Sequence, residues 1–444
     1  MHTASSTRRG FLGALGLGAG LALGGCGLTS GDTYRQPDST VPAEYTGRQR
    51  VVAWTTWGSD SGKAMSELGT RFNQSQKDIF VDVQSQNGNY NKLAQKLTTG
   101  LRAHVIPDIA VFSEVTWHKF VLNDILEPAE NHMSAKDLAV YNQDLLKEGV
   151  LGGKTWWIPF ARSTPLFFYN PEIFEKAGLP ARAPETWTEL AEWAGQLQGV
   201  QYKSNKPRMM TYPKTDADWK FQGLLWNFGG TISKGLDVTF DHDPVIAAGE
   251  YQQRLIKKGH GYMSASANVD FQTGVVAAIE QSTGSLKEMA TAAEFEVKAA
   301  FVPGEKERAV PTGGGGFSIM APAAKENKAA AAEFLKFLAR PENSAYWTLA
   351  TGYMPVVDAA KKEPELAEKL KEDPNFSVAV EQLKYSRPED DLRLFSLNAT
   401  LDLTDGVERI STTDGAVGPI FRDVADWLRQ DAEQIEEQYR RIMA

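Results

Sequence analysis

The sequence predicts an α/β protein with two lobes, because short apolar runs alternate with helical periods along most of its 444 residues. At roughly 150 residues per domain, this length suits about two or three domains with a sizeable core. The composition, with 42% hydrophobic and 23% charged residues, is that of a globular chain. We therefore expect two α/β lobes around a cleft, where ligands bind outside the carboxyl ends of strands.

The folded body begins with a strand–helix–strand–helix–strand rhythm. Apolar runs predict strands over 51–54, 80–83 and 108–112. This rhythm indicates a mostly parallel sheet covered by helices. The two segments between the strands have helical stripes of apolar residues, Met65, Leu68 and Phe72 in the first and Leu93, Leu97 and Leu101 in the second.

The alternation continues to the C-terminus. Further strands are expected at 166–169, 297–301 and 317–320. A helix should end before Pro341, because proline interrupts the hydrogen bonds of a helix. The apolar face of that helix is Ala331, Phe334, Leu335 and Leu338, and a long C-terminal helix carries Phe421, Val424, Leu428, Ala432, Ile435 and Ile442.

Residues 1–25 have the layout of a secretory signal peptide, with Arg8-Arg9, an apolar run and then small residues before Cys26. The run TRRGFL resembles the twin-arginine export motif, which implies export of a folded chain. LGGC, which ends at Cys26, resembles a bacterial lipobox, whose cysteine is lipidated before cleavage. The alternative is an ordinary signal peptide with an incidental cysteine. Since Cys26 is the single cysteine, we expect it to be the lipid anchor, followed by a flexible tether over 26–47.

Charge and cysteine content exclude several classes of function. One cysteine forms no intramolecular disulfide and rules out Cys-based zinc sites and CxxC redox chemistry. A net charge of −9, which becomes −11 once Arg8 and Arg9 are removed, argues against nucleic acid as the partner. Any bound phosphate must therefore rely on local donors.

Catalytic motifs are missing from the sequence. The histidines are scattered without HExxH spacing, and neither a GxSxG elbow nor a Walker loop occurs. Asp241-His242-Asp243 imitates a metal site, but its polar surroundings favour a solvated loop. We predict no cofactor, no metal site and no enzymatic activity. Eleven tryptophans, several beside small polar residues, suit a cleft that holds a sugar or polyol.

Several motifs resemble extracellular solute-binding proteins of ABC importers. RFNQSQ from Arg71, GNY ending at Tyr90 and TGYMP from Thr351 occur in that order, and PFARSTPLFFYN, KAG and STGS lie between them. The resemblance covers about 50–440 and is closest to the glycerol-3-phosphate and glycerophosphodiester binders. It implies the two-lobed periplasmic-binding-protein fold of type II, with a hinge between the lobes. Lobe one would comprise 48–160 and 317–355, and lobe two would comprise 161–316 and 356–444.

The same resemblance implies a binding site. Tyr90 and Glu114 match positions that hold glycerol hydroxyls, and Glu114 suits this role because a carboxylate accepts two hydrogen bonds. Trp219 matches a stacking tryptophan, and Asp216 replaces a second tryptophan that the family often has. The other matching positions are Ser163, Ser282, the backbone N–H groups of Gly313 and Gly314, and Tyr353, which matches a phosphate-hydroxyl contact.

A phosphate also calls for an arginine, whose planar fork matches its oxygens. Arg393 is the candidate, although some family members place this arginine about eight residues later, where this chain has Leu401.

These features predict the substrate-binding lipoprotein of an ABC transporter. It would capture glycerol-3-phosphate or a glycerophosphodiester such as glycerophosphocholine in the interlobe cleft. It would act as a monomer, anchored to the outer face of the cell membrane through Cys26, and deliver its ligand to an ABC permease. One alternative is the same scaffold binding a neutral sugar or oligosaccharide, and another is a secreted glycosidase or phosphodiesterase.

Overall fold

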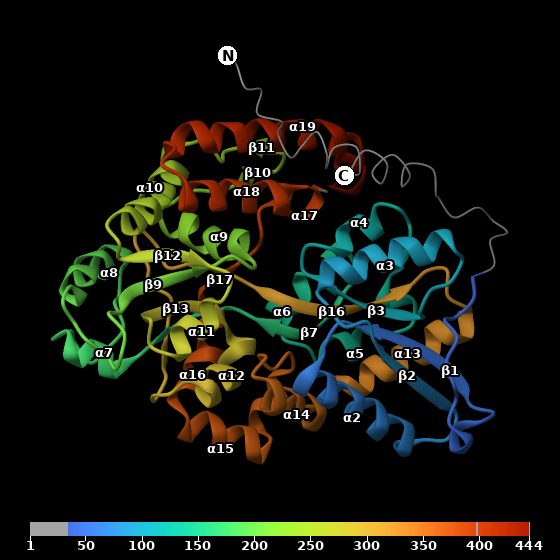
Figure 1. The fold of residues 1–444 in the computed structure, drawn as a ribbon. Coiled ribbons are helices and arrows are strands. Elements are labelled where there is room, and N and C mark those ends of the chain that lie inside the picture. Colours follow the sequence, from blue (N-terminus) through green and yellow to red (C-terminus); the bar gives the residue numbers. More distant parts are fainter. Residues whose placement is uncertain (1–33, 397, 444) are drawn as a thin grey trace.

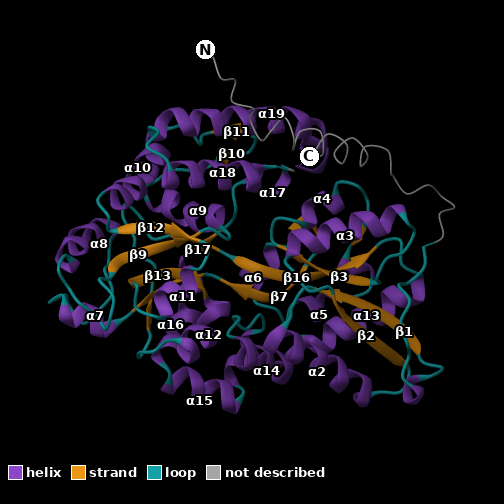
Figure 2. Ribbon diagram, viewed as in Figure 1, coloured by secondary structure: helices purple, strands orange, loops and turns teal. Residues whose placement is uncertain are grey.

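Two β-sheets, each covered by helices, organise the chain (Figures 1 and 2). The structure is a computed structural model that describes residues 34–396 and 398–443. The predicted signal peptide and Cys26 therefore lie outside the described residues. Among the described residues, no helix has the length and apolar character needed to cross a membrane.

The first sheet has the strand order β2-β1-β3-β16-β4, with β7 paired to β16. The predicted start is confirmed: β1 pairs in parallel with β2 and β3, because α2 and α3 return the chain in the same direction. β16 is antiparallel to β3, β4 and β7, since it enters from the other sheet, so the expectation of a mostly parallel sheet is wrong here. The elements are β1 (Gln49–Thr55), α2 (Ser59–Ser75), β2 (Ile79–Ser85), α3 (Tyr90–Arg102), β3 (Ile109–Ser113), β4 (Leu126–Glu127), β7 (Ile158–Ser163) and β16 (Gly313–Met320).

The second sheet has the order β12-β9-β13-β8-β14. It too mixes directions, because β9 pairs in parallel with β12 and β13, while β8 is antiparallel to β13 and β14. Its strands are β8 (Pro165–Tyr169), β9 (Arg208–Pro213), β12 (Gly261–Ser264), β13 (Val276–Ser282) and β14 (Lys298–Ala300). Short pairs elsewhere are β5 (Val150–Leu151) with β6 (Lys154–Thr155), β10 (Ser233–Lys234) with β11 (Asp237–Val238), and β15 (Val310–Pro311) with β17 (Ser386–Arg387).

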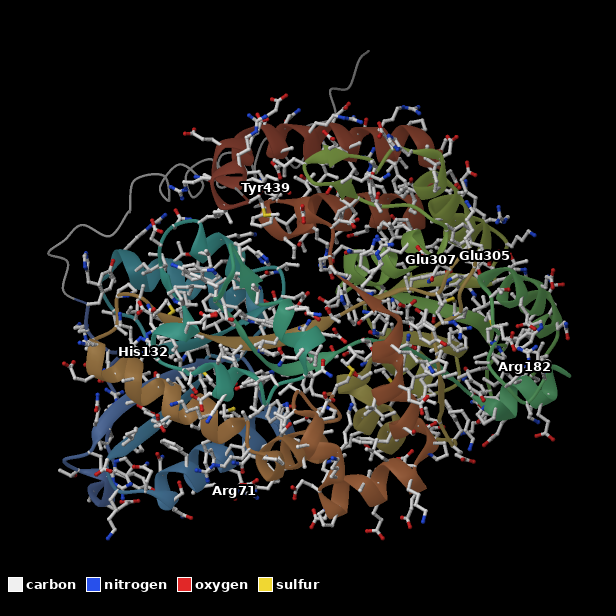
Figure 3. All side chains as sticks on the ribbon, turned by 180° about the vertical axis from the view of Figure 1, so that it is seen from behind. Arg71, His132, Arg182, Glu305, Glu307 and Tyr439 are labelled. Atoms are coloured by element: carbon white, nitrogen blue, oxygen red, sulfur yellow. The ribbon has the colours of Figure 1, made fainter. Side chains whose placement is uncertain are left out.

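Helices complete both lobes. The predicted helix before Pro341 is α13 (Lys325–Leu338), and the long C-terminal helix is α19 (Val417–Met443). The Tyr439 hydroxyl of α19 donates to the Asp391 carboxylate of α17 (Asp391–Phe395) at 2.5 Å (Figure 3). The others are α4 (Trp117–Val121), α5 (Ala135–Leu138), α6 (Gln143–Lys147), α7 (Pro171–Lys176), α8 (Trp187–Ala194), α9 (Ala217–Asn227), α10 (Asp243–Lys257), α11 (Ala267–Gln272), α12 (Leu286–Ala292), α14 (Pro341–Thr351), α15 (Pro364–Glu372), α16 (Pro374–Glu381), α17 (Asp391–Phe395) and α18 (Ala399–Thr412).

Three segments pass between the two sheets side by side. β7 runs directly into β8 of the second sheet, and β16 pairs with β7 from Gly313 onward. Met354 bridges to Arg162 of β7, where its N–H donates to the Arg162 carbonyl at 2.8 Å. These crossings are the structural basis for a hinge, while the residue limits of the lobes remain a prediction.

The segment before β1 lies against the first lobe. The Gln36 amide donates to the Asp108 carboxylate at 2.6 Å, and Tyr45 stacks on Phe80 at 4.8 Å. Gln36 and Tyr45, which fall within the predicted tether, thus contact the first lobe, and the part of that tether before Tyr34 lies outside the described residues.

The two lobes touch on both sides of the crossing strands. His118 of α4 lies 5.0 Å from Phe395 of α17, measured between ring centroids. Lys287 of α12 lies 4.0 Å from Asp60 of α2. The structure is therefore closed, and groups between the lobes are shielded from water.

Candidate functional site

Polar side chains from both lobes converge where β16 begins. Glu114 follows β3 directly and Tyr90 opens α3, both in the first lobe. Trp219 of α9 and Arg393 of α17 approach from the second lobe. Parallel strands and helix ends thus bring together residues that are far apart in sequence, as expected for an interlobe cleft.

The glycine run of β16 makes room for the aromatic rings. A Cβ atom built on Gly313 would lie 2.6 Å from the Trp219 ring, and one on Gly315 would lie 2.6 Å from the Tyr90 ring. Gly314 has φ +92°, and a side chain there would collide with the Ala161 carbonyl oxygen. Glycine is required because the backbone itself forms one wall of the site.

The remaining predicted residues surround the same strand. Ser163 of β7 pairs with Gly313. Tyr353 stacks on Trp347 at 5.9 Å and lies beside Gly284, whose N–H donates to the Ser282 hydroxyl. The structure therefore places every predicted cleft residue around the start of β16. The predicted list is Tyr90, Glu114, Ser163, Trp219, Ser282, Gly313, Gly314, Tyr353 and Arg393.

Arg393 is buried and not on the surface. Its Nη2 donates to Asp218 at 2.9 Å, and its Nη1 lies 3.0 Å from Glu389 and 3.9 Å from Glu114. Burial alone would lower the pKa of Arg393, but these carboxylates raise it above the ordinary value. Leu401 is 68% exposed, whereas Arg393 lies buried among these carboxylates.

Glu114 lies between two guanidinium groups. Its carboxylate oxygens are each 3.9 Å from an arginine, Oε2 from Nη1 of Arg162 and Oε1 from Nη1 of Arg393. Burial raises the pKa of Glu114 to about 7, and the two arginines oppose that rise. Glu114 therefore titrates near neutral pH instead of staying fully ionised.

Glu114, Arg162 and Arg393 together have four buried polar atoms without a hydrogen-bond partner among the described residues. They are Oε2 of Glu114, Nε of Arg162, and Nε and Nη1 of Arg393. Buried polar groups are almost always hydrogen-bonded, because leaving one unpaired costs about 1–3 kcal/mol. Such a cluster, drawn from both lobes, indicates a place where a polar ligand binds.

Comparison with known proteins agrees with this geometry. The family model described as bacterial extracellular solute-binding protein matches residues 67–378. The chain belongs to this family.

Individual relatives extend the comparison. The sn-glycerol-3-phosphate-binding periplasmic protein UgpB of Salmonella paratyphi A is 26% identical over 381 residues, 78% of this chain and 83% of its own. UgpB of Yersinia pseudotuberculosis is 27% identical over 360 residues, which cover 76% of this chain and 81% of its own. The crystal structure of UgpB from Mycobacterium tuberculosis in complex with glycerophosphocholine is 30% identical, with a TM-score of 0.81, and covers 87% of this chain and 99% of that chain.

Sugar-binding proteins share the fold alone. A cyclic α-maltosyl-1,6-maltose binding protein from Arthrobacter globiformis superposes with a TM-score of 0.75 at 21% identity, over 87% of this chain and 100% of that chain. The two-lobed fold and the family predicted from the sequence are thus confirmed. The chain is an extracytoplasmic solute-binding protein of an ABC importer and not an enzyme, as predicted.

Arg162 is a site residue of this solute-binding protein that sequence reasoning missed. Its side chain is fully buried on β7, pairs with Glu148 and donates to the Gly313 carbonyl at 2.5 Å. Its guanidinium lies 4.9 Å from the centre of the Trp157 ring. The sequence did show a charged residue inside the apolar segment IPFARS. Its partner Glu148, however, lies outside that segment, just after α6. Asp218 and Glu389 were missed for the same reason.

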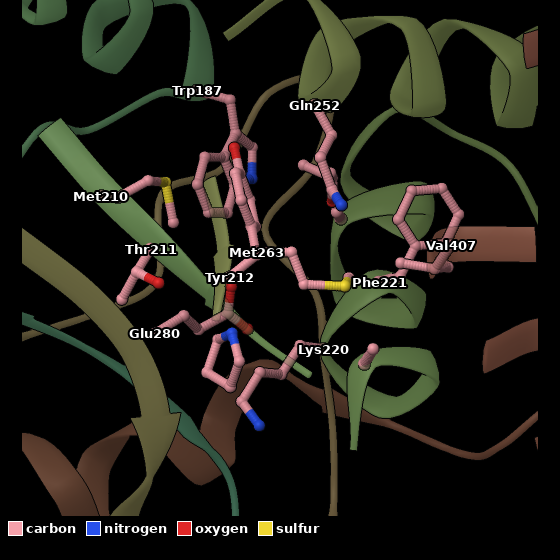
Figure 4. A pocket seen from close by; sticks show the side chains of 13 residues that line it. Trp187, Met210, Thr211, Tyr212, Lys220, Phe221, Gln252, Met263, Glu280 and Val407 are labelled. Atoms are coloured by element: carbon pink, nitrogen blue, oxygen red, sulfur yellow. The ribbon is translucent and has the colours of Figure 1, made fainter. Parts of the chain in front are cut away.

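A separate pocket lies inside the second lobe, between the sheet and α9 (Figure 4). Lys220 and Glu280 line it, and burial raises the pKa of Glu280 to about 8 while the positive charge of Lys220 opposes that rise. This pair lies on elements of lobe two alone. It adjoins the convergence of the two lobes around β16 through Lys220, whose Nζ lies 5.5 Å from the centre of the Trp219 ring.

Proposed function

We propose that this solute-binding protein captures glycerol-3-phosphate or a glycerophosphodiester such as glycerophosphocholine between its lobes. The main structural support is a buried cluster of polar groups without hydrogen-bond partners, which comes from both lobes. It consists of Glu114, Arg162 and Arg393. The names of the relatives from Salmonella, Yersinia and Mycobacterium support this class of ligand. No bond is broken, and closure of the lobes removes the ligand from water.

Each predicted residue has a part in this proposal. Tyr90 and Glu114 receive the glycerol hydroxyls, and the flat Trp219 ring covers the C–H face of the polyol. Backbone N–H groups of Gly313 and Gly314, with the hydroxyls of Ser163, Ser282 and Tyr353, donate to the phosphate side of the ligand. Arg393 provides the charge that complements the phosphate. Because residues of both lobes take part, the ligand favours the closed state.

A neutral sugar or oligosaccharide is the alternative, because sugar-binding proteins share this fold. The position of Arg393 favours the phosphate. Its side chain is only 3% exposed, at the place where the lobes meet. Its Nε and Nη1 have no hydrogen-bond partner among the described residues, and phosphate oxygens accept from a guanidinium more strongly than neutral hydroxyls do.

Calorimetric titration of the purified protein tests the ligand class. We expect heat of binding with glycerophosphocholine or glycerol-3-phosphate, and none with maltose or trehalose. In a thermal melt, a ligand at 100 times its Kd adds about 2.7 kcal/mol of stability. Binding of the sugars without the phosphates would overturn the proposal in favour of the neutral-sugar alternative. Steady release of products from glycerophosphodiesters would contradict a purely binding role.

The proposal includes attachment to the membrane. We propose that twin-arginine export carries the folded chain outward, that lipidated Cys26 anchors it to the outer face of the cell membrane, and that it works as a monomer with an ABC permease. The sequence around Cys26 supports this, since small residues precede the single cysteine.

Replacing Cys26 with serine tests the anchor. The variant should incorporate no labelled fatty acid and should move from the membrane to the soluble fraction. The reason is that a serine hydroxyl cannot form the thioether that joins diacylglycerol to a cysteine. Ser30→Ala, a change four residues away in the same segment, should stay in the membrane. A Cys26→Ser protein that remains membrane-bound would refute lipid anchoring.

A further inference from the structure

Carboxylates outnumber guanidinium groups around the proposed phosphate position. Arg162 and Arg393 are the two cations, and Glu114, Glu148, Asp218 and Glu389 are the four buried or partly buried acids that pair with them. With every group ionised, these six side chains carry a net charge of −2. An anionic ligand would therefore enter a site that is already negative, which like-charge repulsion disfavours.

Glu389 is the acid that most directly competes with a ligand. It lies just before α17, its side chain is 4% exposed, and its Oε2 is 3.0 Å from Nη1 of Arg393. Neither of its oxygens has a hydrogen-bond partner among the described residues. Asp218 occupies Nη2 of the same guanidinium. Nε and Nη1 of Arg393 have no hydrogen-bond partner among the described residues, and an ionised Glu389 beside Nη1 would repel a phosphate that approached them.

We infer that Glu389 is a further ligand-binding residue that acts in its protonated form, so that capture of the phosphate group of a ligand is coupled to uptake of one proton. The inference rests on the proposed function. A neutral carboxyl beside Nη1 of Arg393 no longer repels a phosphate that accepts a hydrogen bond from that nitrogen. Its O–H becomes a donor to a phosphate oxygen. The proton comes from solvent and stays on Glu389 while the ligand is bound, so no bond other than this O–H forms or breaks.

The other charged groups that face Glu389 agree with this reading. Burial raises the pKa of Glu389 to about 8, Arg393 opposes the rise, and Glu114 from the facing lobe and neighbouring Asp390 add to it. Asp390 accepts from the Ile232 N–H at 2.5 Å on its other side. Glu114, with a pKa raised to about 7, titrates earlier than Glu389. A bound phosphate adds a negative charge, which raises the pKa of Glu389 further and causes proton uptake.

The sign of the pH dependence follows. Below about pH 7 Glu389 is already protonated in the free protein, so ligand binding carries no free-energy cost for protonating it. As pH rises through about 8, the free protein loses the proton that the complex retains, so affinity falls. For one such group the fall between pH 6.5 and 9.0 is about tenfold.

Glycerophosphocholine is the probe for the experiment, because its phosphodiester and quaternary ammonium do not titrate in this range. Calorimetry in buffers with different ionisation enthalpies at pH 8.5 counts the protons taken up with the ligand. We expect about one proton for the wild type. We expect close to none for Glu389→Gln, since the amide imitates the neutral carboxyl. Its affinity should match that of the wild type at pH 6.5 and stay nearly constant up to pH 9.0. Glu437→Gln, an exposed change on α19, should behave as the wild type.

The outcomes separate the inference from the function on which it rests. A wild-type protein that binds glycerophosphocholine with no proton uptake and a flat pH profile overturns the inference alone, and so does undiminished uptake in Glu389→Gln. No binding of any phosphate ligand at any pH overturns the proposed function and the inference together. Circular dichroism checks the fold of the variant. Should Glu389→Gln fail to fold, the wild-type proton count decides, because zero uptake contradicts the inference without the variant.

Discussion

Replacing Arg393 with alanine should weaken binding of glycerophosphocholine by about 2–5 kcal/mol, roughly 30-fold to several thousand-fold in Kd. The size follows from burial, since the Arg393 side chain is only 3% exposed and its charge is not screened by water. The phosphate would lose its charged donor, while Asp218 would lose the guanidinium from which it accepts a hydrogen bond. Calorimetric titration at pH 7 measures the change.

Two further variants show whether the loss belongs to the charge in the site. Arg429→Ala removes a partly exposed arginine of α19 that pairs with Asp241 and Asp426, and should leave Kd unchanged. Arg393→Lys keeps the charge without the planar fork and should fall between the wild type and Arg393→Ala. An unchanged Kd in a folded Arg393→Ala protein would support a neutral ligand and would contradict our assignment of the phosphate.

Arg162→Met should have the largest effect on folding, a loss of about 3–5 kcal/mol in the free energy of unfolding. Methionine keeps much of the apolar contact with Trp157, so the loss reports the charge. Glu148 would be left buried without its ion pair, and the Gly313 carbonyl without its donor. Urea unfolding at pH 8 measures the difference from the wild type.

The deficit of Arg162→Met should shrink in acid. Burial already raises the pKa of Glu148, and the wild-type Arg162 opposes that rise, so removal of Arg162 raises it further. A carboxyl whose folded-state pKa is raised destabilises the protein increasingly as pH rises above its unfolded value. The variant should therefore be closer to the wild type at pH 5 than at pH 8. Arg440→Met, at a side chain that is 76% exposed, is the matched control and should change little. A deficit that is the same at both pH values would show that packing, and not charge, is what Arg162 provides.

The order of strands and helices could be predicted because it depends on local patterns. Leu93, Leu97 and Leu101 repeat with the helical period, and α3 spans Tyr90–Arg102. The apolar run at Phe317 lies in β16, as predicted, but the strand begins four residues earlier at Gly313. The start of β16 could not be predicted, because glycines have no side chains whose apolar pattern would indicate a strand.

The residues of the candidate site could be predicted where the resemblance to the family supplied a matching position. Tyr90 and Tyr353 lie in such motifs, and both surround the glycine run of β16. The family arginine could correspond to position 393 or to position 401. The structure distinguishes the two positions, because Arg393 is buried and Leu401 is exposed. Arg162 lies within the motif PFARSTPLFFYN, but no pattern in the neighbouring sequence indicated that Glu148 would pair with it.

By itself the sequence determined the alternation of strands and helices, the single cysteine at position 26 and the family to which the chain belongs. These are properties of residue type and of spacing within one segment. Only the tertiary structure decided that β16 returns antiparallel, that Arg162 and Arg393 lie on either side of Glu114, and that Glu389 competes for the same guanidinium. The physical reason is that the charge and protonation of a buried group depend on partners brought together by folding, and those partners are separated here by as many as 279 positions of the chain, from Glu114 to Arg393.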